Sequence, residues 1–210
     1  MAEPHEDETT APTTAPALPW HQRGSMQLGL FRTKHPVDVP ADVPVISRRL
    51  LVVFTIRYRG GDTTHNAMGV ALPARHRLRF GYYAPRFLID DPVIRQACND
   101  HLHLRATPAS LTWDDTRLRA APHGTPTLDM DCRPTTDATL PLHVPLSTFV
   151  RDHHDALGYF AVPGTARCSP ATMTIHTWPE DLPELTSHST RMALYLRSFS
   201  ITVPPPRPLP

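Results

Sequence analysis

The fold class is decided by residues 50–58, which read LLVVFTIRY. β-branched and aromatic residues dominate this run, as is typical of a well-buried strand. Glycines at 60 and 61 end it, and AMGVAL at 67–72 begins a second strand. A third strand is predicted over 78–89, which carries four aromatic residues. The domain therefore begins with consecutive strands.

One helix is predicted directly after the third strand. Asp91 caps its first turn, and Pro92 suits the first helical position because that position needs no N–H donor. Val93, Ile94 and Ala97 then fall near one face of the helix.

Beyond the helix the strand signals resume, and residues 150–157 form either a short helix or a loop. Six further strands are predicted, over Ala109–Trp113, Arg117–Ala120, Thr127–Cys132, Leu140–Val144, Thr172–Trp178 and Met192–Val203. Many short strands with one helix predict a mainly β (α+β) fold, an antiparallel β-barrel or double sheet with one or two short helices.

The length and the ends of the chain predict one domain. The 210 residues suit a single core over residues 25–203. Residues 1–24 are predicted to be a disordered tail, because they are rich in acids, threonine, alanine and proline. Residues 204–210, which read PPPRPLP, are predicted to be an extended, open tail.

Charge and cysteine content limit the classes of partner and the cellular compartment that we expect for this protein. A formal net charge of +1 gives no reason to expect nucleic acid or an anionic membrane as a partner. No apolar run is long enough to cross a bilayer. An odd number of cysteines without a close-spaced pair predicts free thiols and a cytoplasmic protein. These cysteines are Cys98, Cys132 and Cys168.

Lysine is nearly absent from the chain. Of the 21 basic residues only Lys34 is a lysine. Schiff-base catalysis needs an amine that can lose its proton, and arginine cannot supply one. Lys34 lies in a polar segment and is predicted on the surface.

Several pieces of sequence between residues 48 and 113 follow one another in a recognisable order. They are Leu51–Tyr58, Gly60-Gly61, His65-Asn66-Ala67, Gly81-Tyr82-Tyr83, Asp90-Asp91-Pro92 and Asn99-Asp100. In this order and spacing the chain resembles the acetoacetate decarboxylase-like family. The resemblance implies a barrel that encloses the active site, and because members of that family often assemble, it leaves a homo-oligomer open.

The departures from the family concern its charged catalytic groups. In the family a lysine six residues after the helix-end glutamate forms a Schiff base with the β-keto acid. With Asp100 at the glutamate, the lysine position holds Ala106. The family's active-site glutamate corresponds to Ala67. The resemblance therefore implies a member without decarboxylase chemistry, and decarboxylation through Lys34 is only a third alternative.

Two alanines in place of charged groups predict a larger and less polar cavity, which suits an apolar substrate. We therefore expect an enzyme of specialised metabolism such as polyketide or antibiotic biosynthesis. It would act as a cyclase (including a pericyclic one), isomerase or dehydratase on a hydrophobic intermediate. A non-catalytic protein that binds a small molecule in the same cavity is the alternative. We predict no cofactor and no metal, because His101 and His103 offer a ligand spacing without a third ligand.

The candidate site residues follow from this reading. Acid–base and polarising groups are assigned to Asp100, His101, His103 and Arg86. Substrate contacts are assigned to Tyr82, Tyr83, Ala67, Ala106, His65 and Trp113. Packing in the core is the alternative role for the aromatic members of this set.

Asp129 and Asp131 alternate with apolar residues, which places both carboxylates on one face of a strand. If that face meets water, the pair is solvated. If it points into the barrel, the two acids form a close pair in which one pKa is raised.

Overall fold

The computed structural model describes residues 20–60, 63–121, 128–143, 146–151, 154–162 and 164–209. Its elements are β1 (Trp20–Arg32), β2 (Leu50–Gly60), β3 (Thr63–His76), β4 (Arg79–Ile89), α1 (Pro92–Leu102), β5 (Thr107–Pro108), β6 (Ser110–Asp114), β7 (Arg117–Ala121), β8 (Leu128–Pro134), β9 (Leu140–His143), β10 (Leu146–Arg151), β11 (Leu157–Val162), β12 (Gly164–Thr177), β13 (Ser189–Val203) and β14 (Arg207–Pro208).

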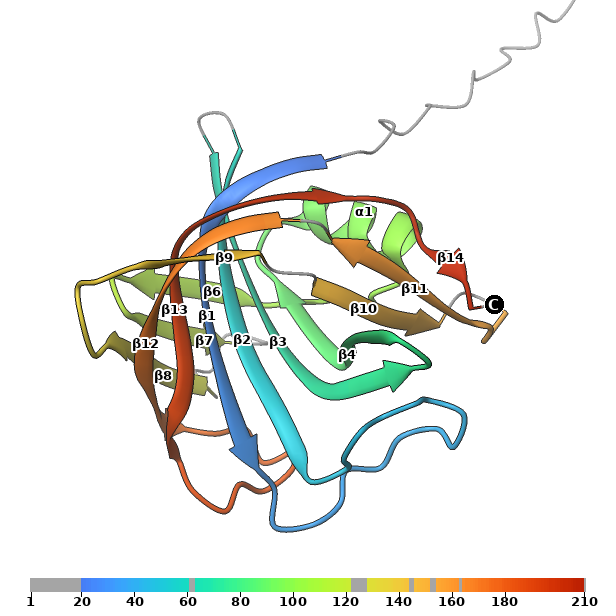
Figure 1. The fold of residues 1–210 in the computed structure, drawn as a ribbon, viewed down its shortest axis with the longest axis horizontal. Coiled ribbons are helices and arrows are strands. Elements are labelled where there is room, and N and C mark those ends of the chain that lie inside the picture. The colour runs from blue at the N-terminus through green and yellow to red at the C-terminus, as the bar shows by residue number, and fades with distance from the viewer. Residues whose placement is uncertain are drawn as a thin grey trace, which may run out of the picture.

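The described strands form one large sheet in the order β14-β11-β10-β4-β3-β2-β1-β13-β12-β8-β7-β6, with β5 beside β4 and β9 beside β12. Most neighbours are antiparallel, as predicted, but β4 pairs in parallel with both β10 and β5. The sheet is therefore mixed, and its hydrogen-bonded path stays open between β14 and β6. Figure 1 shows how strongly the strands curve to enclose the interior of this mainly β fold.

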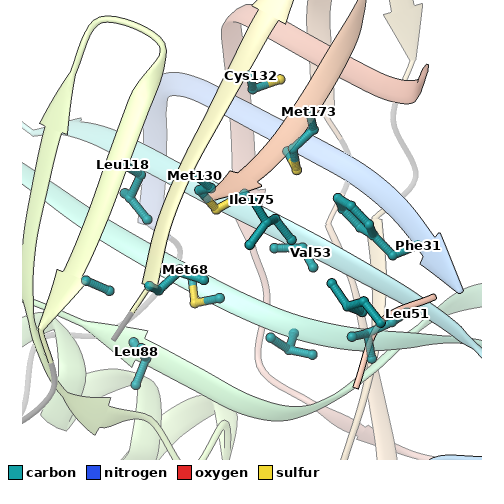
Figure 2. Close-up of a cluster of buried hydrophobic side chains, with 14 of the residues drawn as sticks. Phe31, Leu51, Val53, Met68, Leu88, Leu118, Met130, Cys132, Met173 and Ile175 are labelled. Atoms are coloured by element: carbon teal, nitrogen blue, oxygen red, sulfur yellow. The ribbon is translucent and has the colours of Figure 1, made fainter. Parts of the chain in front are cut away.

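The curvature folds the sheet back on itself and creates a first core. Figure 2 shows apolar side chains of β1 to β4 meeting those of β7, β8 and β12. The buried members drawn there include Phe31, Leu51, Val53, Met68, Leu118, Met130 and Met173. The other face of β2 and β3 belongs to a second cluster. A strand buried on both faces reads as a continuous apolar run, which explains LLVVFTIRY.

The helix begins and ends on local signals. The Asp91 carboxylate accepts a hydrogen bond from the Ile94 N–H at 2.8 Å, and Pro92 occupies the first turn, as predicted. The helix ends at Leu102, and the C-cap residue His103 has a φ of 54°, which lies in the left-handed region. Cys98 and Leu102 are its buried residues and join the second cluster. The helix therefore covers one part of the second core.

The chain ends depart from the prediction of open tails. β1 begins at Trp20, inside the predicted 1–24 tail, and is paired on both sides, by β2 and β13. Backbone pairing overrides the polar sequence there, while residues 1–19 lie outside the described part. At the other end Arg207 and Pro208 pair with Tyr159 and Gly158 of β11. The proline-rich segment is therefore partly bound to the sheet.

The prediction of a short helix or a loop over residues 150–157 is wrong at both ends of the segment, where the described residues belong to strands. β10 extends through Arg151, and β11 begins at Leu157. Thr127 and Val144, the predicted ends of two other strands, lie outside the described residues. All three cysteines are free thiols, as predicted, and all three are buried. Within the described part no helix is both long and apolar enough to span a membrane.

Candidate functional site

A cavity of about 100 Å³ lies within the second cluster. Its wall is built by strands β1, β2, β4, β10, β11 and β13 and by α1. It is lined by Met26, Leu28, Val52, Phe54, Ile56, Tyr58, Tyr82, Ala84, Phe87, Ile89, Ile94, Cys98, Leu102, Leu104, Thr148, Phe160, Ile201 and Val203. Only two phenols, one thiol and one hydroxyl among these side chains carry polar groups. The cavity is therefore an apolar space with a few neutral hydrogen-bonding groups.

Strand register explains the shape of this wall. Phe54, Gly69 and Phe87 are cross-strand partners on β2, β3 and β4. The missing side chain at Gly69 makes room for the Phe54 ring, because a Cβ there would lie 2.2 Å from that ring. The rings of Phe54 and Phe87 are 5.7 Å apart between centroids. Gly69 is therefore the position at which the sheet admits two aromatic rings side by side.

The polar groups of the cavity are uncharged at neutral pH. Burial raises the pKa of Tyr58 and of Tyr82 above the usual range of a phenol. Burial also raises the pKa of the Cys98 thiol to about 12. No carboxylate, guanidinium, ammonium or imidazole occurs among the described residues that line the cavity. The groups present can donate a hydrogen bond to a carbonyl oxygen, and none supplies a charge.

The two alanines that the resemblance places at the family's charged positions lie in the second cluster, and neither is among the described residues that line the cavity. Ala67 is fully buried between its cross-strand partners Ile56 and Ile89. Ala106 is buried in the same cluster, and the Asn99 side chain holds its backbone. The Ala106 N–H donates to Asn99 Oδ1 at 2.5 Å, and Asn99 Nδ2 donates to the Ala106 carbonyl at 3.0 Å. Methyl groups therefore stand where the resemblance implies an acid and an amine.

Lys34 lies away from the cavity. Its side chain is half exposed and forms an ion pair with Glu184. It is not among the residues that line the cavity. The single lysine therefore has no access to a ligand bound there.

His65 lies at the edge of the cavity wall. It is the cross-strand partner of Tyr58, which lines the cavity. Its Nδ1 is 3.0 Å from the second carboxylate oxygen of Asp91, the residue that caps α1. The imidazole is thus tied to the start of the helix and does not itself line the cavity.

A bulge in β4 separates the predicted site residues of that strand. Tyr82 and Arg86 share a parity, so in a regular strand both side chains would lie on one face. Ala84 and Pro85 together stand opposite Ala71. This extra residue reverses the alternation of side chains, so even-numbered residues point into the cavity before the bulge and odd-numbered residues do so after it. Tyr82 lines the cavity, whereas Arg86 forms an ion pair with Asp181 outside it. Tyr83 packs against the first core on the other face.

The remaining predicted residues lie elsewhere. Asp100 is exposed and accepts a hydrogen bond from Gln96. His101 lies in the last turn of α1, and His103 lines a separate hollow with residues of β11 and β14. Trp113 belongs to the first core, where its Nε1 donates to the Asp115 carbonyl. None of these four assigned residues lines the cavity.

Several lining residues were not assigned from the sequence. Phe54 and Tyr58 share a parity in the LLVVFTIRY run, and this signal was available. Cys98 faces the cavity from α1. Thr148 gave no local signal, because only the parallel pairing of β10 with β4 brings it beside Tyr82.

Asp129 and Asp131 lie on the face of β8 opposite Met130, where Asp129 is half-buried and Asp131 is buried. Asp129 accepts hydrogen bonds from Arg117 Nε at 2.7 Å and Arg117 Nη2 at 2.5 Å. Asp131 accepts from Thr116 and Arg133. The two acids are therefore paired with arginines and are not an acidic pair inside the barrel.

This pairing predicts an acid-sensitive contribution to stability. The hydrogen bond from Arg117 holds the pKa of Asp129 below its usual value of 3.8. The pairing therefore stabilises the native state above that pH and is lost as the pH falls through the lowered pKa. We expect Asp129→Asn to have a lower Tm than the parent at about pH 6 and the same Tm near pH 2. Asp137→Asn, which alters an exposed acid, is the control. A Tm difference independent of pH would contradict the assignment.

The described residues contain no group of three histidine, cysteine or acidic side chains arranged to hold a metal ion.

Comparison with known proteins finds similarity in structure alone. No model of a known protein family and no curated protein matches the sequence. The acetoacetate decarboxylase of Legionella pneumophila superposes with a TM-score of 0.69 at 13% identity, over 100% of this chain and 98% of that one. The enduracididine biosynthesis enzyme MppR, complexed with the condensation product of pyruvate and imidazole 4-carboxaldehyde, gives 0.63 at 14%, over 95% and 92%. An acetoacetate decarboxylase-like enzyme from Sphingomonas wittichii gives 0.58 at 12%, over 90% and 92%. This chain has the acetoacetate decarboxylase-like fold.

Proposed function

We propose that this protein binds a hydrophobic small molecule in its cavity and rearranges it, as a cyclase or isomerase, without a covalent intermediate. The observation that carries the proposal is the composition of the wall, which is apolar apart from neutral hydroxyl and thiol groups. Such a wall excludes water and holds a flexible chain in a reactive conformation, which lowers a barrier by several kcal/mol. The proposed rearrangement passes through no charged intermediate, so the cavity needs no charged side chain to stabilise one.

The two phenols give the cavity its polarity. Tyr58 and Tyr82 enter from different strands, and burial keeps both protonated. A neutral donor in an apolar site polarises a carbonyl oxygen more strongly than it does in water. A carbonyl at one end of a hydrophobic substrate would therefore be held and activated between them.

The size of the cavity limits what it holds in this conformation. A cavity of about 150 Å³ holds one benzene molecule, and this one measures about 100 Å³. It is therefore smaller than a cavity that holds one benzene ring, and the binding of a ring or of a longer substrate requires the rings of Phe54 and Phe87 to move. A polyketide-like intermediate would thus contact the cavity wall along only part of its length.

A non-catalytic binding protein is the second candidate. One observation favours it: no described lining residue changes its protonation state near neutral pH. A protein that merely stores or carries a hydrophobic ligand needs no such group. Structural relatives include enzymes such as MppR, but at 14% identity they support the fold and not a reaction.

The cavity can be tested by filling it. Ala84→Leu replaces a methyl group in the wall by an isobutyl group, so we expect benzene to bind the parent and to bind this variant at least tenfold more weakly. The matched control is Ala161→Leu, at an exposed position of β11. Calorimetric titration measures both. Equal affinity in the two variants would place the binding site outside the cavity.

Catalysis is tested with the metabolite that accumulates when the gene is deleted. We expect an isomer of the end product, or a compound heavier by one water, and purified parent protein should convert it. Binding without conversion would favour the carrier. An adduct on Lys34 after borohydride reduction with acetoacetate would overturn both candidates and restore decarboxylation.

A further inference from the structure

A second hollow, of about 710 Å³, lies on the face of the sheet opposite the cavity. Residues 23 and 25 of β1 alternate with Met26, which lines the cavity, and Arg59 alternates with Tyr58 in the same way. We call this hollow the arginine groove. Its lining includes Gly24, Pro141, Ala166 and Phe199 together with four arginines and four hydroxyl residues, namely Arg23, Arg59, Arg167, Arg197, Ser25, Thr165, Ser198 and Ser200.

Strand register brings these residues into one row. Arg59 of β2 pairs with Arg23 of β1, Arg23 pairs with Ser200 of β13, and Ser200 pairs with Thr165 of β12. Cross-strand partners point to the same side of a sheet and lie about 5 Å apart. Two guanidinium groups and two hydroxyl groups therefore project side by side from four adjacent strands.

A bulge in β13 adds another guanidinium to this face. Gly24 pairs with Phe199 and Met26 with Leu196, so Arg197 and Ser198 together oppose Ser25. The register with β12 shifts at the same place. In a regular strand consecutive residues point to opposite faces, but Arg197 and Ser198 both line the groove. Bulges re-aim side chains in this way and are frequent beside functional sites.

The positive charge of the groove is largely uncompensated. Arg197 forms an ion pair with Asp137 at 3.1 Å, and Arg167 donates to the Thr139 hydroxyl at 3.0 Å. Arg23 and Arg59 have no acidic partner among the described residues. Like charges directly opposite one another destabilise a sheet. Since the whole chain has a formal net charge of only +1, the excess of positive charge is confined to this part of the surface.

We propose that the arginine groove binds a small molecule that carries two or more phosphate groups. Guanidinium groups bind phosphate oxygens in pairs of parallel hydrogen bonds, and hydroxyl groups supply further donors. The volume lies within the range of about 300 to 1,000 Å³ that small-molecule sites have. Single-stranded nucleic acid is disfavoured, because base stacking needs exposed aromatic rings and Phe199 of the groove is buried.

The proposal is tested by titrating the full chain with inorganic pyrophosphate and with ADP in a calorimeter. We expect both to bind, and Arg23→Ala and Arg59→Ala each to weaken binding at least tenfold. Arg191→Ala removes the same charge from an exposed position of β13 outside the groove and should leave the affinity unchanged. Tighter binding of ADP identifies an organic diphosphate as the ligand class, and equal binding identifies the inorganic anion.

A second measurement is independent of the ligand. Arg59→Ala relieves the like-charge pair with Arg23, so its Tm without any anion should equal or exceed that of the parent, which also shows that the variant folds. No binding of either anion at about 1 mM would overturn the proposal. So would an equal loss in Arg191→Ala, or an oligonucleotide that binds more tightly with length and is not displaced by pyrophosphate.

Discussion

Ala106→Lys is expected to destabilise the protein by about 3–5 kcal/mol at neutral pH, the cost of a buried charge without a partner. Ala106 is 6% exposed within the second cluster, and Asn99 fixes its backbone from both sides. The new ammonium group therefore cannot easily swing out to water. Urea unfolding of the parent and the variant measures the difference.

The loss depends on pH in a defined direction. Burial lowers the pKa of the new lysine below its usual value of about 10.4. The penalty is therefore complete below the lowered pKa and shrinks as the pH rises toward 10. Ala161→Lys, at an exposed position of β11, is the matched control and should cost little at any pH. A variant at Ala106 that is as stable as this control would show that the position is open to solvent.

Adding an acid nearby tests whether the two alanines share one site. Ala67→Glu alone buries a carboxylate and should also cost several kcal/mol. Together with Ala106→Lys it forms an ion pair. The loss of stability in the double variant should therefore be smaller than the sum of the two single losses by about 1–3 kcal/mol. Additive losses would place the two positions too far apart to interact.

The lysine variant also carries a chemical expectation. A desolvated lysine has a lowered pKa and attacks a ketone, and the imine that forms with loss of water is reduced by borohydride to a stable amine. We expect acetoacetate with borohydride to leave an adduct on Ala106→Lys and none on the parent. Mass spectrometry of peptides locates it. An unmodified lysine at position 106 would mean that the ketone does not reach this part of the cluster.

Local signals predicted most of the central sheet and the helix. The run LLVVFTIRY is β2, and Asp91 with Pro92 starts α1, because capping and burial on both faces leave marks on neighbouring residues. β1 was not predicted at all, because residues 21–25 are polar or glycine and pairing with β13 and β2 makes this segment a strand.

The site was harder to predict, because its geometry depends on irregularities between strands. The bulge at Ala84 and Pro85 sends Tyr82 into the cavity and Arg86 out of it, although both have the same parity in the sequence. The lining by Thr148 arises from a parallel pairing between strands far apart in the chain. No pattern within one strand encodes either feature.

Phe54→Ala is expected to lower the free energy of unfolding by about 3–5 kcal/mol and to enlarge the cavity. The ring lines the cavity, lies over Gly69 and contacts Phe87, so its removal takes away one wall. A larger cavity should admit larger ligands. We therefore expect naphthalene to bind this variant more tightly than it binds the parent, and calorimetric titration compares the two.

Gly69→Ala changes the same contact from the opposite side. The added Cβ would lie 2.2 Å from the Phe54 ring, so the ring must turn into the cavity. We expect a loss of about 1–3 kcal/mol, as for other overpacked cores, and weaker binding of benzene. In the Phe54→Ala background the clash is absent, so Gly69→Ala should then cost almost nothing. A loss that persists without the ring would show that strain in β3 itself, and not the aromatic wall, requires glycine at this position.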